Sequence, residues 1–211
     1  MKIICVCPNS YAANTYLLVC DNNAIVVDPS ISVAAIERAL AEQKASLCGI
    51  LLTHGHFDHT ISVDTLRDKY DVPLMIHKSD ACMLTNGRIN GFFDFYAQEC
   101  VHKAADKLFD NGDMIPLGKE SIEVINTRGH SPGSSCFLCP RDGGGHFLIS
   151  GDTLFSNTVG RCDLWGGNEQ ELLESLKGLK GLDPETTIYP GHGPSSKLGA
   201  ALEIALYYVD F

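Results

Sequence analysis

The stretch His54-Gly-His-Phe-Asp-His59 places three imidazole groups and one carboxylate within six consecutive positions. Zinc and similar divalent ions prefer imidazole nitrogens and carboxylate oxygens as ligands, so this stretch predicts a metal site. On a tight loop, His54 and His56 project to one side, and Asp58 and His59 project to a second side a few ångströms away. The spacing therefore predicts a hydrolytic site for two metal ions about 3.5–4 Å apart.

Two other interpretations would give the same cluster, namely a His-rich surface loop and histidines that form hydrogen bonds in a polar core. The residues before the cluster favour the metal site over both. Cys48-Gly-Ile-Leu-Leu-Thr53 has the apolar character of a buried strand, which would deliver the cluster to the edge of a sheet.

Composition narrows the class of protein. A chain of 211 residues is expected to form one domain, residues 1–211. The net charge of −10 disfavours nucleic acid as a partner, and no apolar run is long enough to cross a membrane. The first residues are too short an apolar run for a signal peptide. The nine cysteines are an odd number and fall mostly in apolar segments, which indicates reduced thiols. We expect a cytoplasmic protein, monomeric or homodimeric.

Apolar segments with strand and helix periodicity alternate along the chain, which predicts an α/β fold with two sheets between helices. Helices are expected around Val33–Leu40, over Ser62–Tyr70, after Ser79, from Asn168 through Leu179, and over Lys197–Tyr208. Strands are expected at Ile3–Val6, Thr15–Cys20, Ala24–Asp28, Gly49–Thr53, Pro73–His77, Met114–Leu117, Ser121–Thr127, Ser135–Cys139, His146–Ser150 and Thr187–Tyr189.

Three segments allow more than one interpretation. Asn86 to Asn111 is rich in aromatic residues without a clear period, so it is either a lid over the site or an edge cluster of the core. Cys136-Phe-Leu-Cys139 has the spacing of a redox or zinc motif, but its setting favours a core strand. Cys162 is either a reactive thiol near the site or, as we favour, a packing residue.

Further metal ligands are expected at the ends of other strands, because a site for two metals needs about seven protein ligands. His130, Asp152 and His192 each follow a predicted strand and lie next to a glycine. Glycine permits the tight turns that direct such side chains to a common point. The other three histidines, His77, His102 and His146, lack this setting and are interpreted as structural or surface residues. His102 is predicted to lie on an amphipathic helix.

These separated motifs, in this order, resemble the metallo-β-lactamase superfamily, and the resemblance covers nearly the whole chain. Gly151-Asp-Thr-Leu-Phe155, Gly160-Arg-x-Asp163 and Tyr189-Pro-Gly-His-Gly-Pro194 resemble in particular its short, glyoxalase II-like hydrolases. The resemblance implies a four-layer αββα sandwich. It also implies that two groups of ligands each hold one metal: His54, His56 and His130 hold the first, and Asp58, His59 and His192 hold the second. Asp152 would bridge the two metals.

The resemblance implies a metallo-hydrolase that acts on a small thioester, such as a 2-hydroxyacylglutathione. A hydroxide bridging two divalent ions would attack the carbonyl group, with zinc as the expected metal and iron or manganese as alternatives. Asp58 and Asp152 are thus the candidate catalytic residues. Arg161 stands where related enzymes place a lysine for a substrate carboxylate, so it is the candidate substrate-binding residue. Asp163 and Pro194 replace substrate-contacting tyrosines of those enzymes.

Other functions stay open at this point. Gly-Arg-x-Asp also resembles persulfide dioxygenases, which would bind one iron through His54, His130 and Asp152. A lactone or ester hydrolase of the same fold is a second alternative. A metal-storing protein is a third, disfavoured because storage sites are closed whereas catalytic sites keep a position for water.

Overall fold

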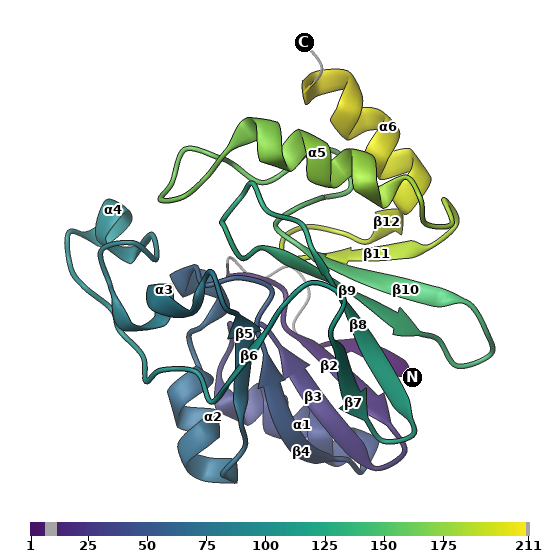
Figure 1. The fold of residues 1–211 in the computed structure, drawn as a ribbon. Coiled ribbons are helices and arrows are strands. Elements are labelled where there is room, and N and C mark those ends of the chain that lie inside the picture. The colour runs from purple at the N-terminus through teal and green to yellow at the C-terminus, as the bar shows by residue number, and fades with distance from the viewer. Residues whose placement is uncertain (7–11, 210–211) are drawn as a thin grey trace.

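The computed structural model describes residues 1–6 and 12–209. In these ranges the strands form two six-stranded sheets, which lie face to face (Figure 1). The first has the order β1-β2-β3-β4-β5-β6, with β1 (Lys2–Cys5), β2 (Tyr16–Cys20), β3 (Asn23–Val27), β4 (Ser46–Leu51), β5 (Leu74–His77) and β6 (Lys107–Phe109). The second has the order β12-β11-β10-β9-β8-β7, with β7 (Met114–Leu117), β8 (Glu120–Asn126), β9 (Ser135–Pro140), β10 (His146–Gly151), β11 (Thr187–Pro190) and β12 (Ser196–Lys197).

Helices cover the outer face of each sheet. Helices α1 (Val33–Gln43) and α2 (Val63–Tyr70) pack against the first sheet, and α5 (Glu169–Leu179) and α6 (Leu198–Val209) pack against the second (Figure 1). The short helices α3 (Ala81–Thr85) and α4 (Phe92–Tyr96) follow β5. The predicted αββα sandwich is therefore confirmed.

Several strands are buried on both faces, because one face meets the opposite sheet and the other meets helices. In β2, Leu18 belongs to the core between the sheets, while Leu17 and Val19 belong to the core under α1 and α2. In β10, Phe147 and Leu148 divide between the inner and outer cores in the same way. Alternate side chains of a strand point to opposite faces, so these strands read in the sequence as continuous apolar runs.

The segment from Asn86 to Asn111 combines both interpretations. Its end forms β6, which is the edge strand of the first sheet, whereas α4 lies beside the candidate site. The helix predicted around His102 is wrong, because no helix or strand spans residues 97–106. The Nδ1 atom of His102 instead lies 3.1 Å from a carboxylate oxygen of Asp64 on α2, and this tertiary contact fixes an irregular segment.

Seven cysteines of the described ranges are free thiols, namely Cys20, Cys48, Cys82, Cys100, Cys136, Cys139 and Cys162. Cys136 and Cys139 lie on β9 and face different cores, so they form a core strand rather than a CxxC site. Cys162 is partly buried against the outer core of the second sheet, and burial raises its pKa. Cys7 lies outside the described residues. Across those residues, no helix combines the length and the apolar character needed to cross a bilayer.

Candidate metal centre

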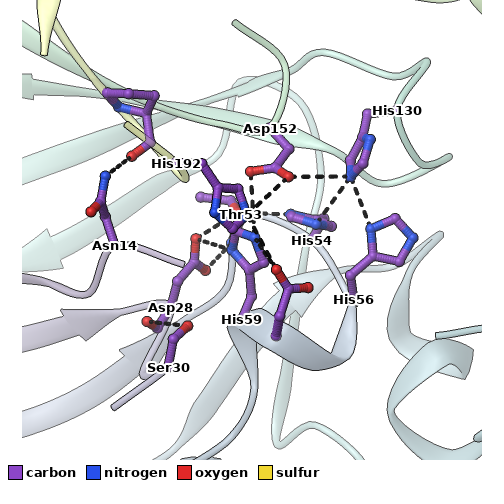
Figure 2. Close-up of polar contacts among 12 residues, drawn as sticks. Asn14, Asp28, Ser30, Thr53, His54, His56, His59, His130, Asp152 and His192 are labelled. Atoms are coloured by element: carbon purple, nitrogen blue, oxygen red, sulfur yellow. Dashed lines mark hydrogen bonds and ion pairs between the residues drawn. The ribbon is translucent and has the colours of Figure 1, made fainter. Parts of the chain in front are cut away.

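The candidate ligands meet at one edge of the two facing sheets, where several strands end. The loop after β4 carries His54 and His56, and the 3₁₀ turn Phe57–His59 carries the next two candidates. From the second sheet, His130 follows β8, Asp152 follows β10 and His192 follows β11. Figure 2 shows the histidines and Asp152 turned toward a common centre. Each site residue predicted as a metal ligand thus lies in the same cluster.

The first group of ligands consists of three buried imidazoles. His130 Nε2 lies 2.8 Å from His56 Nδ1 and 3.2 Å from His54 Nε2. Burial, reinforced by the neighbouring imidazoles, lowers the pKa of His54 well below its usual value. Burial and the proximity of His130 lower the pKa of His56 to about 3. Both rings are therefore neutral near pH 7, which is the form that coordinates a metal.

The second group combines two imidazoles with a carboxylate. Asp58 Oδ2 lies 3.2 Å from His192 Nε2 and 3.7 Å from His59 Nε2. Burial alone would raise the pKa of Asp58, but the two histidines beside it hold that pKa below its usual range. Asp58 is therefore ionised at neutral pH and offers a charged oxygen to a cation.

Asp152 lies between the two groups. Its Oδ1 atom is 3.4 Å from His59 Nε2, and its Oδ2 atom is 3.7 Å from His130 Nε2 and 3.5 Å from His192 Nε2. Histidines 54 and 59 form a third close group with the same carboxylate. One carboxylate thus reaches both groups, as a ligand that bridges two ions must.

Hydrogen bonds outside the cluster fix which ring nitrogen faces it. His59 Nδ1 lies 2.9 Å from Asp28 Oδ2 (Figure 2). His130 Nδ1 lies 2.7 Å from the carbonyl oxygen of Arg161. A carboxylate and a carbonyl only accept hydrogen bonds, so each Nδ1 carries the proton. Nε2 is therefore the nitrogen that each ring turns toward the centre and that a metal would bind in place of a proton, which is the usual arrangement of a metal-binding histidine.

A hydrogen bond to Thr53 fixes the position of the ring proton of His54 in the same way. The Thr53 hydroxyl donates to Asp28 Oδ2 at 2.7 Å, and its oxygen lies 3.0 Å from His54 Nδ1. A hydroxyl has one proton, so the His54 Nδ1–H donates to Thr53 and leaves Nε2 free. Asp28 Oδ1 also accepts the Thr53 backbone N–H at 2.8 Å. Asp28 thus orients ligands on both sides of the cluster.

The donor set fits a cation. His59 Nε2 and Asp152 Oδ1 are buried and face each other at 3.4 Å, but neither forms a hydrogen bond of normal geometry with any described residue. Buried polar atoms are nearly always paired, so unpaired atoms that converge on one point indicate a ligand. Imidazole nitrogens and carboxylate oxygens suit zinc, iron or manganese.

Two supporting carboxylates were missed by the sequence analysis. Asp28 ends an apolar strand just as Asp152 does, and that position was an available signal. No local sequence pattern marks Asp80 as a supporting residue, because its hydrogen-bond partners are distant in the sequence. It is fully buried and accepts hydrogen bonds from Gly55 N at 3.1 Å, Ser131 Oγ at 2.6 Å and Gly133 N at 2.6 Å. Asp80 thereby ties the loop of His54 and His56 to the loop of His130.

A cavity of about 300 Å³ opens over the cluster, and its lining includes Arg161, the predicted substrate-binding residue. The guanidinium group of Arg161 forms two bonds to Asp163, from Nε to Oδ1 at 2.5 Å and from Nη2 to Oδ2 at 2.6 Å. Arg161 is therefore at the expected place, but a substrate carboxylate would have to compete with Asp163 for it.

The fold has two facing sheets with helices on both outer faces, and seven candidate histidine and aspartate ligands cluster at one edge of it. This combination is typical of a class of metal-dependent enzymes. The model of the metallo-beta-lactamase superfamily matches residues 9–192, and the chain belongs to this superfamily. Its fold and sequence place it among the metallo-hydrolases of that superfamily.

Individual relatives agree with this assignment. The chain is 36% identical over 186 residues to YqgX of Bacillus subtilis, a probable metallo-hydrolase. The alignment covers 87% of this chain and 86% of the relative. The structure of BLEG-1, a B3 metallo-beta-lactamase, is 32% identical, with a TM-score of 0.85 over 96% of both chains. The structure of TTHA1623 in a di-iron-bound form is 30% identical, with a TM-score of 0.80 over 92% of this chain and 94% of the other. The glyoxalase II subtype stays a prediction.

Replacement of Gly191 by alanine is expected to disrupt the cluster. A Cβ atom at this position would lie 2.1 Å from Asp152 Oδ1 and 2.8 Å from His59 Cε1, so both ligands would have to move. We expect bound metal and turnover to fall on the order of 10-fold or more. Metal analysis of the purified variant checks this result. Gly178→Ala, where a Cβ meets nothing within 4 Å, is the matched control; normal metal content in Gly191→Ala would contradict the geometry.

Proposed function

We propose that this protein is a thioesterase that uses two divalent metal ions, with zinc as the expected metal, to hydrolyse a small thioester of the hydroxyacylglutathione type or a related one. The observation that carries the proposal is the pair of three-residue ligand groups that share Asp152 beneath the cavity. In the reaction, water adds to the acyl carbon, the C–S bond breaks, and a carboxylic acid and a thiol are formed.

The chain's own contribution is a set of ligands whose ring orientations are fixed by hydrogen bonds and whose two carboxylates are ionised. Asp28 and the Arg161 carbonyl hold the protons of His59 and His130 on the outer ring nitrogens. Asp58 and Asp152 keep pKa values below the usual range, because nearby histidines outweigh the effect of burial. Two divalent ions bound there would supply Lewis acidity, which lowers the pKa of water and polarises a carbonyl group.

The cavity lining favours a thioester over an amide as the substrate, because of what each leaving group requires. Among the described residues that line the cavity, each titratable side chain except Arg161 belongs to the ligand groups. No free general acid is therefore present in that lining to protonate a departing amine. A thiol has a pKa near about 8.5, so a thiolate can leave without a proton. This chemistry fits the residues that the cavity offers.

The test is thiol release by the metal-loaded protein from two substrates, S-D-lactoylglutathione and S-acetyl-N-acetylcysteamine, with a chelator-treated sample as control. Metal-dependent release from either substrate supports the proposal. A cephalosporin is assayed in parallel, because one similar structure is that of a β-lactamase. Cleavage of the cephalosporin with no thiol release from either thioester would overturn it. One iron per chain with oxygen consumption on a persulfide would instead indicate the dioxygenase alternative.

A further inference from the structure

One wall of the cavity is built from aromatic residues that no metal site requires. Phe57 lies between the ligands His56 and Asp58 in the sequence and lines the cavity. Its ring centroid is 5.2 Å from that of Phe92 and 5.9 Å from that of Phe95, both on α4. Such distances are those of favourable edge-to-face and tilted ring pairs. Phe57 therefore joins the metal loop to an aromatic cluster on α4.

Helix α4 is held against the metal loop by the backbone as well. The Phe57 N–H donates to the carbonyl oxygen of Asn90 at 3.0 Å. The next residue, Gly91, lines the cavity, and a Cβ there would lie 3.6 Å from His56 Cδ2. Any side chain at Gly91, the residue before α4, would thus be in van der Waals contact with the ligand His56. The α4 residue that lines the cavity, Phe95, is therefore placed where it can contact a substrate.

Phe95 is the residue of α4 that lines the cavity while remaining 57% exposed. Its ring centroid lies 5.9 Å from the guanidinium carbon of Arg161. Elsewhere in the lining, the ring centroid of Phe155 lies 6.1 Å from that of His192. Leu164 adds a further apolar side chain. The part of the cavity away from the ligands is therefore largely apolar.

Charge offers little additional recognition. Arg161 is the one lysine or arginine among the described residues that line the cavity, and Asp163 already pairs with it through two bonds. Asp94 on α4 also acts on Arg161 electrostatically. Binding energy that distinguishes one substrate from another is thus available mainly from the apolar surface.

We propose that this site selects thioesters whose acyl group carries an apolar substituent about the size of one aromatic ring, and that Phe95 is a specificity-determining residue. The inference rests on the proposed function and narrows its substrate class. A cavity of about 300 Å³ is at the small end for ligand sites. It matches a single ring or a short branched chain better than a long acyl chain.

The test compares S-phenylacetyl-N-acetylcysteamine with S-acetyl-N-acetylcysteamine, which differ only in the ring. Wild-type protein is expected to have a kcat/KM at least about 10-fold higher for the phenylacetyl substrate, since an added apolar group in such a pocket is worth that much or more. Phe95→Ala is expected to lose about 10-fold with the phenylacetyl substrate and less than about 2-fold with the acetyl one.

Phe93→Ala is the matched control on the same helix. The Phe93 ring packs on the Arg88 guanidinium, with 4.6 Å between that group's carbon and the ring centroid, and Phe93 does not line the cavity. This variant is expected to leave both substrates unchanged. Equal rates for the two substrates in wild-type protein, or equal losses for both in Phe95→Ala, would overturn the inference.

A binding measurement separates this inference from the proposed reaction. Phenylacetate and acetate are titrated into the metal-loaded wild type, Phe95→Ala and Phe93→Ala, with calorimetry as the readout. Tighter binding of phenylacetate that is lost only in Phe95→Ala supports the apolar selectivity even if no thioester is hydrolysed. Equal binding of the two acids in all three proteins overturns the selectivity even if thioesters are hydrolysed.

Discussion

At the proposed two-metal site, replacement of Asp58 by alanine is expected to reduce bound metal from two ions per chain to one and to lower turnover on the order of 10²–10³-fold. The reason is that Asp58 supplies the carboxylate oxygen of the second ligand group, 3.2 Å from His192 Nε2. Without this negative charge, the second ion would keep only two imidazoles and the carboxylate of Asp152, which it shares with the first ion. The first group has its own three ligands, so its metal is expected to stay bound.

Metal content and thioester hydrolysis, measured on the same preparation, check this result. Asp68→Ala is the control, because Asp68 is an exposed aspartate on α2 that pairs with Lys103. The control should retain two ions and full turnover. Two tightly bound ions with full activity in Asp58→Ala would show that the second metal position has been assigned to the wrong residues.

Replacement of Asp80 by alanine is expected to lower the free energy of unfolding by about 3–5 kcal/mol, although Asp80 touches no candidate ligand side chain. Its carboxylate accepts three hydrogen bonds in a fully buried position. The variant leaves the backbone N–H groups of Gly55 and Gly133 buried and unpaired. Each such group costs about 1–3 kcal/mol.

Thermal unfolding of the metal-free protein measures this effect without a contribution from metal binding. For a chain of this size, the midpoint is expected to fall on the order of 10 °C. Asp80→Asn keeps one acceptor oxygen and should be destabilised less than Asp80→Ala. A midpoint equal to that of wild type in Asp80→Ala would show that the two loops are held together by other contacts.

Local chemistry made much of the metal centre predictable. Few residue types bind divalent ions, so three histidines and an aspartate within His54–His59 stood out at once. The three distant candidates were recognisable because each follows an apolar strand beside a glycine, as His130 does. Strands were also recognisable, since residues buried on both faces produce continuous apolar runs.

The segment from Asn86 to Asn111 shows where such reasoning fails. Its helix α4 has five residues, which is too short for a helical period to emerge, and its position depends on contacts with Phe57. The helix predicted around His102 was wrong because a tertiary contact to Asp64 overrides the local pattern. Local propensity is weak compared with such contacts in short segments.

The sequence by itself determined the kinds of atoms that this protein can offer to a metal, and the strand ends from which they are presented. Only the tertiary structure decided which of them share an ion, since His130 meets His54 across 76 positions of the chain. It alone also revealed the roles of Asp28 and Asp80, and the pairing of Arg161 with Asp163. The physical reason is that ligand type is a property of one residue, whereas distance, burial and ionisation depend on neighbours that only the folded chain brings together.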